Sequence, residues 1–169
     1  MVASIRLSLL VLLAAALAPA PAHALDADPM QVCQSAAAGA DFACKAIIDS
    51  PGAAADARAV AHLRLAWVLG RDGANAQALR HADAAVGLAP KWFVAYNERA
   101  VVHLRAKRYG AAVADYGRAL ALNPQAVYSL YGRGLARGGL GQAQAAEADF
   151  AAARRLQADI DAVFKGFGL

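Results

Sequence analysis

Two cysteines are the residues best suited to covalent chemistry in this 169-residue sequence. Cys33 and Cys44 are its only cysteines, and they lie near each other early in the chain. A redox-active dithiol would favour Cys-x-x-Cys at a helix start, and this spacing is far longer. A metal site would need further ligands beside the pair, and none is close in sequence. Two cysteines in an exported chain favour a structural disulfide.

Residues suited to catalysis are sparse. The three histidines beyond residue 24 fall on separate predicted helices without the i, i+4 spacing of a metal site: His62, His81 and His103. The only hydroxyl-bearing Ser or Thr residues there are Ser35, Ser50 and Ser129. With no nucleophile beside a His and an Asp, the sequence does not indicate an enzyme. It indicates no cofactor and no metal.

Residues 1–24 have the three-part layout of a secretory signal peptide. Arg6 precedes an apolar run over residues 7–17, and two prolines precede a small-residue site at 22–24. The run is shorter than the ~20 residues that span a bilayer, so we expect cleavage before Leu25 and no stable membrane span. A composition rich in Ala, Gly and Arg suggests a bacterial genome. We therefore expect a periplasmic or secreted protein.

The charge of the chain argues against nucleic acid as a partner. The whole sequence has a formal net charge of +4, which falls to +3 without residues 1–24. The basic residues are spread along the chain, without the stripe that nucleic-acid binding needs.

Helical hairpins are the elements that must position these residues. Segment 93–126 is predicted to form two amphipathic helices joined by a short turn, and Pro90 and Pro124 lie 34 residues apart. Segments 59–92 and 127–160 align with it without a gap. Small and aromatic residues recur at equivalent places, among them Tyr96, Ala100, Ala112, Tyr116 and Ala119 of the middle segment.

These three segments resemble tetratricopeptide repeats, in which small residues let two helices approach and aromatics fill the space between hairpins. Arg99 and His103 depart from the pattern, because an apolar residue and an aromatic are expected there. The resemblance implies an all-α, right-handed α-solenoid of three hairpins.

Atypical helices are expected at both ends of the stack. Residues 25–58 are predicted to form an N-terminal hairpin cap with the Cys33–Cys44 disulfide. Its helices are placed at 29–38 and 41–49, and residues 51–58 form the linker to the first repeat. A C-terminal capping segment is predicted over 158–169, with its helix at about 158–165.

The resemblance also implies a concave groove that is lined by the first helix of each repeat and binds peptide segments of partners. Its main positions here would be Arg64, Trp67, Arg71, Asn97, Glu98, Val101, Arg105, Tyr128 and Tyr131. Further groove positions would be Val60, Leu63, Val94, Leu104 and Leu135. Trp67 is either an exposed anchor or core covered by the N-terminal cap, and the C-terminal helix could cover both tyrosines in the same way.

Arg71 and Arg105 occupy equivalent places near the ends of successive first helices. They could hold an acidic side chain or a carboxylate of the partner, or they could simply complement the helix dipoles. The sequence thus predicts a non-enzymatic adaptor of the bacterial envelope that binds a protein or peptide segment. The alternative is a self-associating structural protein whose groove and ends are buried in a homo-oligomer.

Overall fold

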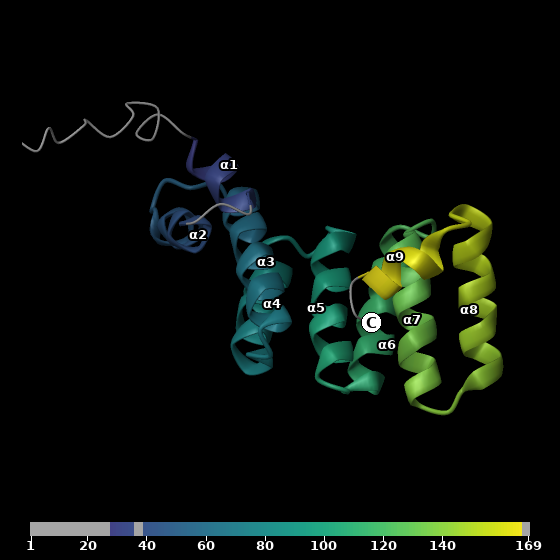
Figure 1. Cartoon of the computed structure of the whole chain (residues 1–169). Coiled ribbons are helices and arrows are strands. Elements are labelled where there is room, and N and C mark those ends of the chain that lie inside the picture. Colours follow the sequence, from purple (N-terminus) through teal and green to yellow (C-terminus); the bar gives the residue numbers. More distant parts are fainter. Residues whose placement is uncertain (1–27, 36–38, 167–169) are drawn as a thin grey trace, which may run out of the picture.

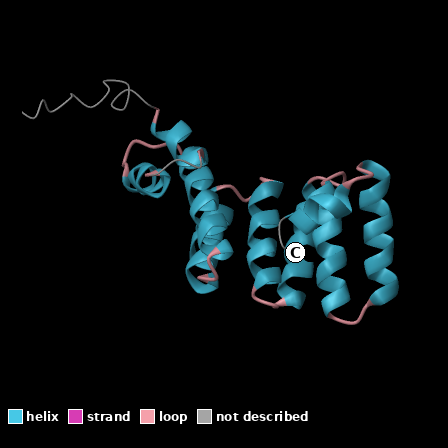
Figure 2. Cartoon of the chain, in the orientation of Figure 1, coloured by secondary structure: helices cyan, strands magenta, loops and turns pink. Residues whose placement is uncertain are grey.

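The computed structural model describes residues 28–35 and 39–166, and within them it has nine helices and no strand. Helices α3 to α8 stand side by side in chain order, as antiparallel pairs, and α9 lies back beside α7 (Figures 1 and 2). Their bounds are α1 Pro29–Gln34, α2 Ala40–Asp49, α3 Ala55–Arg71, α4 Asn75–Leu88, α5 Phe93–Arg105, α6 Tyr109–Leu122, α7 Val127–Gly139, α8 Ala143–Leu156 and α9 Ile160–Gly166. The predicted all-α stack of helical hairpins is confirmed. The predicted signal peptide lies outside the described residues.

Buried alanines hold the two helices of each hairpin together. One position on the second helix is Ala78, Ala112 or Ala146 in successive hairpins, and these alanines are at most 4% exposed. A second position, Ala85, Ala119 or Ala153, is fully buried. Because alanine has a single methyl group, the helix axes can approach closely at these points. The recurring small residues therefore set the geometry of all three hairpins.

The turn inside each hairpin uses one residue in the left-handed conformation. That residue is Gly73, Lys107 or Gly141 in successive hairpins, with φ of 81°, 56° and 75°. The next residue donates its backbone N–H to a carbonyl five residues earlier at 2.8 to 2.9 Å, which ends the first helix as in a Schellman motif. Glycine has no Cβ penalty in this conformation, whereas lysine does. The middle turn therefore carries strain that the other two lack.

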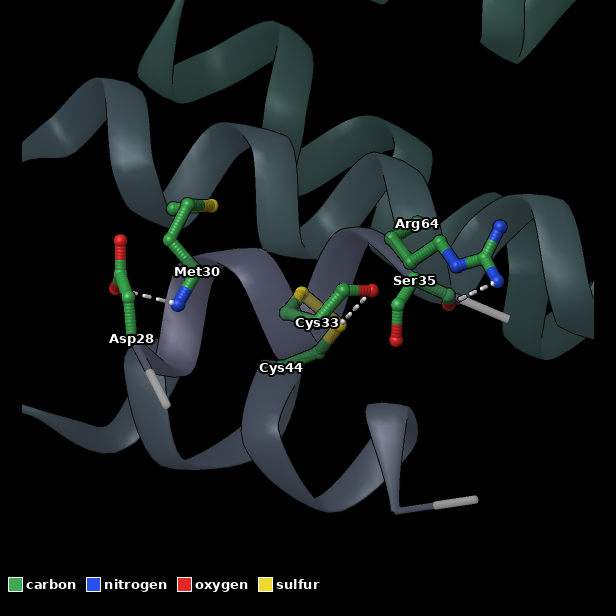
Figure 3. Close-up of a disulfide and its surroundings, with 6 residues drawn as sticks. All are labelled: Asp28, Met30, Cys33, Ser35, Cys44 and Arg64. Atoms are coloured by element: carbon green, nitrogen blue, oxygen red, sulfur yellow. Dashed lines mark hydrogen bonds between the residues drawn. A yellow bond between two sulfur atoms is a disulfide. The ribbon is translucent and has the colours of Figure 1, made fainter. Parts of the chain in front are cut away.

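The N-terminal cap is built around the predicted disulfide (Figure 3). Cys33 and Cys44 are joined, and both are fully buried. Ile47, Ala61 and Leu65 pack in the same cluster, so the cap rests on α3. The cap and the first hairpin therefore share one core.

Three predicted helix boundaries need correction. Helix α1 ends at Gln34 instead of residue 38, and residues 36–38 lie outside the described part of the chain. Helix α3 begins at Ala55, so the second half of the predicted linker is helical. The Arg58 N–H already donates to the Ala54 carbonyl, and Asp56 favours the positive end of the helix dipole. Helix α9 begins at Ile160 because the chain is extended at Gln157.

Two ion pairs of the same geometry lock the second and third hairpins. Arg99 donates to both carboxylate oxygens of Asp115 at 2.7 Å, and Arg133 donates to both oxygens of Asp149 at 2.9 and 2.7 Å. Both aspartates are buried. Arg99, which departs from the repeat pattern in sequence, is thus a half-buried partner of a buried aspartate on the opposite helix. The signal in the sequence is an Arg and an Asp sixteen residues apart, repeated one period later.

The first hairpin has a histidine pair in this region instead. The Nδ1 atoms of His62 on α3 and His81 on α4 lie 2.9 Å apart, so one neutral ring donates to the other. Burial lowers the pKa of both imidazoles, and the cations Arg58, Arg80 and Lys45 act in the same direction. Sequence spacing did not predict this contact, because it depends on how the two helices align across the turn.

Candidate functional site

One face of the stack is formed by the first helices of the three hairpins. Helix α3 contacts α5, and α5 contacts α7. Among the described residues, α4 makes no contact with α6, and α6 makes none with α8. Because the first helices lie closer together than the second helices, the stack curves toward the face of α3, α5 and α7. We call this face the groove.

The groove contains a cavity of about 520 Å³. Residues of all three first helices, the α6–α7 connection and the C-terminal segment line it: Trp67, Phe93, Val94, Asn97, Glu98, Val101, Arg105, Asn123, Gln125, Ala126, Val127, Tyr128, Ser129, Gln157 and Phe164. The structure therefore brings together six of the nine main positions predicted for the groove. Apolar and aromatic side chains make most of the wall, with a few convergent polar groups, as is typical of binding sites.

A chain of hydrogen bonds fixes the polar groups of the cavity. The Ser129 hydroxyl of α7 donates to Asn97 Oδ1 of α5 at 2.8 Å, and Asn97 Nδ2 donates to Glu98 Oε1 at 3.1 Å. Ser129 is fully buried and Asn97 is 9% exposed, so the bond between them is shielded from water. Burial raises the pKa of the Glu98 carboxyl above its usual value, against the opposing effects of the Asn97 amide and the Arg105 charge. Sequence reasoning did not include Ser129 in this arrangement.

Comparison with known proteins identifies the repeat that carries this arrangement. The family description "Tetratricopeptide repeat" matches residues 93–126, the hairpin of α5 and α6. Residues 93–126 form a tetratricopeptide repeat.

Among curated proteins, the TPR repeat-containing thioredoxin TDX of Arabidopsis thaliana is 36% identical over 88 residues, which are 52% of this chain. The matched part is 23% of that protein, so this chain spans less than a quarter of its relative's length.

Three solved structures share the fold. The second TPR of Spaghetti (RPAP3), bound to the HSP90 peptide SRMEEVD, is 21% identical with a TM-score of 0.56, covering 59% of this chain and 92% of that one. The first TPR domain of human RPAP3 is 23% identical with a TM-score of 0.58, covering 60% and 80%. MamA protein is 19% identical with a TM-score of 0.58, covering 71% and 63%. At these identities the likeness concerns the fold alone.

Trp67 stands at the edge of the groove, and the N-terminal cap does not enclose it. The side chain is 37% exposed and lines the cavity. The guanidinium carbons of Arg64 and Arg71 lie 5.0 and 5.1 Å from its ring centroid, within cation–π range. Arg64 also donates to the Ser35 carbonyl at 2.7 Å, which ties the cap to α3 (Figure 3). The two arginines therefore hold the indole in place at the rim.

Helix α9 covers Tyr131, one of the two predicted groove tyrosines. The Tyr131 hydroxyl donates to Asp161 Oδ1 at 2.8 Å, and its ring lies 4.4 Å from Phe164 between centroids. Tyr131 is therefore an anchor for α9 and does not line the cavity. Tyr128 is 45% exposed and does line it. Phe164, which the sequence placed only in the capping helix, forms part of the cavity wall.

Two further positions transferred from the resemblance are mostly buried in the core. Leu63 and Leu104 are 6% and 8% exposed, and both belong to clusters of the hydrophobic core. Leu63 packs between adjacent hairpins against Ala85 and Ala95, and only its edge reaches a smaller cavity of about 360 Å³ beside Trp67. A repeat register does not specify which side chains of the groove helix turn inward, because neighbouring hairpins decide this.

The predicted pair of Arg71 and Arg105 is divided between two surroundings. Arg71 lies in the last turn of α3, is exposed and pairs with Asp72 at 3.3 Å. Arg105 lies in the last turn of α5 and lines the cavity, where its charge acts on Glu98. Both placements also complement the negative end of a helix dipole.

Metal ligands and membrane spans were sought in the same part of the chain. Residues 28–35 and 39–166 contain no group of three or more His, Cys, Asp or Glu side chains placed to hold a metal ion. No helix there combines the length and the apolar character that a bilayer crossing requires.

Proposed function

We propose that this chain is a non-enzymatic interaction module that binds a segment of a partner protein in the groove. The observation that carries the proposal is the 520 Å³ cavity, to which all three first helices contribute. An exposed Trp and an exposed Tyr among the lining residues of the cavity supply residue types that dominate interface hot spots. One structural neighbour was solved with a bound peptide, which supports this use of the fold.

The side chains of the cavity favour binding over catalysis. Ser129 is the only hydroxyl of Ser or Thr type among its described lining residues, and it is fully buried and donates to Asn97. No Cys or His lines the cavity among those residues. A nucleophile with an adjacent base, which acyl or phosphoryl transfer would need, is therefore not offered to a bound molecule.

We also propose that the protein works outside the cytoplasm, on a partner of the bacterial envelope. The signal-like sequence of residues 1–24 and a fully buried disulfide support this, because such bonds persist in oxidising compartments. When the protein is expressed in a bacterium with residues 1–24 in place, a periplasmic form should appear. Its intact mass should correspond to a chain that begins at Leu25. A full-length product that stays in the cytoplasm would oppose the proposal.

Self-association is the second candidate. Large apolar side chains are exposed away from the cavity, including Phe42 at 79%, Leu140 at 45% and Leu156 at 47%. Light scattering after size exclusion, over a tenfold range of concentration, distinguishes the candidates. A stable dimer that dissociates in a Phe42→Ser or Leu156→Ser variant would favour self-assembly over an adaptor.

A peptide display library tests the main proposal. Random twelve-residue peptides are captured on the immobilised wild-type protein and then tested against two folded variants. Val101→Arg fills the groove, and Leu156→Ala removes an exposed apolar side chain on α8, outside the groove. We expect captured peptides to lose binding to Val101→Arg and to keep it with Leu156→Ala. Equal binding to both variants would place recognition elsewhere.

A further inference from the structure

We infer that the groove selects a partner segment that places a lysine or arginine side chain, flanked by apolar residues, against the carboxylate of Glu98. This inference rests on the proposed function, because it names the chemistry of the segment bound at the same site.

Glu98 occupies a central place in the groove. It lines the cavity of 520 Å³ and also an adjoining cavity of about 360 Å³ toward α3. The equivalent positions of the neighbouring first helices are Arg64 and Gly132. Glu98 is therefore the one acidic side chain at this position in the three repeats. Any segment that follows the groove from α3 to α7 must pass it.

The carboxylate of Glu98 is held in a defined orientation. The buried chain from Ser129 through Asn97 ends on Glu98 Oε1. A carboxylate group can accept several hydrogen bonds, and this chain occupies one of them. The remaining capacity suits a group with several donors, such as an ammonium or a guanidinium. A fixed acceptor binds such a group with less entropy loss than a mobile one.

Desolvation of the Glu98 carboxylate favours the binding of a cation. Burial is the largest influence on Glu98 and raises its pKa, so the anion is less well stabilised than in water. The Arg105 charge restores part of that stabilisation, and a cation brought beside the carboxylate would add to it. The attraction is strong because the surroundings screen charge less than water does. Glu98 should therefore ionise more readily when the segment is bound.

The walls of the cavity fit the rest of a long basic side chain. Val94, Val101 and Tyr128 line the same cavity as Glu98 and give it apolar surface. Lysine and arginine place their methylene stems along such surface while the charged head reaches a polar partner. Apolar residues on either side of the basic one would contact the same walls and Trp67.

Arginines at the rim would favour an acidic segment, so their effect must be weighed against that of the Glu98 carboxylate. Arg71 pairs with Asp72 and is exposed, and Arg64 is engaged by Trp67 and the Ser35 carbonyl. Charges at an exposed rim are screened by salt and contribute little to affinity. Inside the cavity an acidic side chain would meet both Arg105 and Glu98, and the Arg105 charge already acts on Glu98. Repulsion between partly desolvated like charges is costly. The Glu98 carboxylate, which is oriented by Asn97, should therefore decide the selection.

The display library described above gives the test if it is also applied to Glu98→Gln. Wild type should enrich peptides with a Lys or Arg at one fixed position between apolar residues. One enriched peptide is then synthesised with lysine, or with the uncharged isostere norleucine, at that position, and its affinity for both proteins is measured by fluorescence anisotropy. The charge should strengthen binding to wild type about tenfold or more, and should give no preference with Glu98→Gln.

The outcomes separate this inference from the proposed function. Groove-dependent peptides with no basic preference, or with an acidic one, would overturn the inference and leave the binding function standing. An equal lysine preference in wild type and Glu98→Gln would also overturn it, because another acid would then be the partner. If no groove-dependent peptide is captured, both fail. The experiment compares two peptides on each protein. A loss of folded protein in the Glu98→Gln variant would weaken both peptides alike, so it would not remove the preference for lysine.

Discussion

The first hairpin and the two that follow it share the same arrangement of two helices and a turn. Different side-chain interactions hold their helices together. In the second and third, a buried aspartate on the second helix receives two hydrogen bonds from an arginine on the first. The equivalent residues of the first hairpin are Leu65 and His81, and His81 contacts His62. The fold therefore requires a filled space at this point and no particular charge.

The difference also follows the position in the stack. The first hairpin lies against the N-terminal cap, whose disulfide and apolar cluster support α3 from outside. The third hairpin has only the short helix α9 beyond it. Where covalent support is absent, the hairpins use ion pairs between their helices. The first hairpin should accordingly respond to reduction and to mild acid, and the other two to loss of an aspartate.

Asp149→Ala should have the largest effect. Asp149 is 4% exposed and receives hydrogen bonds from both Arg133 and Arg137. Its loss leaves two partly buried cations without their carboxylate, which costs about 3 to 5 kcal/mol of unfolding free energy. Urea denaturation measures this. Asp72→Ala, which breaks the exposed pair with Arg71, should cost under about 1 kcal/mol. Similar losses in both variants would contradict the special role of the buried pairs.

Removal of the disulfide should be next in size. A Cys33→Ser, Cys44→Ser variant loses the constraint on a short loop, worth about 3 kcal/mol in the chain-entropy model. The loss should be confined to the cap and the first hairpin. Hydrogen exchange should therefore accelerate in α1 to α4 and stay unchanged in α6 to α8. Uniformly faster hydrogen exchange along the chain would show that the whole stack unfolds as one cooperative unit.

Lys107→Gly should stabilise the protein by about 1 kcal/mol. Lysine at φ of 56° carries the Cβ penalty that Gly73 and Gly141 avoid at the equivalent turns. Thermal unfolding measures the gain. Gly141→Ala is the matched control, and it should be destabilising by a similar amount. If Lys107→Gly lowers the melting temperature, the lysine side chain makes a contact worth more than its backbone strain.

Mild acid should have a smaller effect, centred on the first hairpin. Because the folded state lowers the pKa of His62 and His81, the unfolded chain binds more protons below about pH 6.5. Stability should be full above that pH and should fall as the pH decreases toward the lowered values. A His62→Leu, His81→Leu variant should lose part of this dependence. His103 has a lowered pKa too and accounts for some of the remainder.

Sequence patterns predicted the fold because it depends on local and repeated features. Buried alanines recur at each period, and the left-handed turn residue recurs with them. The cysteine pair was also predictable, since two cysteines on a short hairpin face each other. All of these signals lie within one repeat.

The parts that sequence did not predict depend on contacts between repeats. Tyr131 is lost from the groove because α9 folds back onto α7 through Asp161. Leu63 is mostly buried because the next hairpin covers it. Arg99 could be read only as a departure until its partner on α6 was known. Ser129 enters the site through an amide on another repeat.

Backbone amide shifts measured during titration with a captured peptide test the central claim most directly. If the groove is the binding face, the largest shifts should lie on α3, α5 and the start of α7, and the indole N–H of Trp67 should move with them. Helices α4, α6 and α8 should change little. Shifts concentrated on those second helices, with the Trp67 indole unmoved, would show that the protein recognises its partner by another surface.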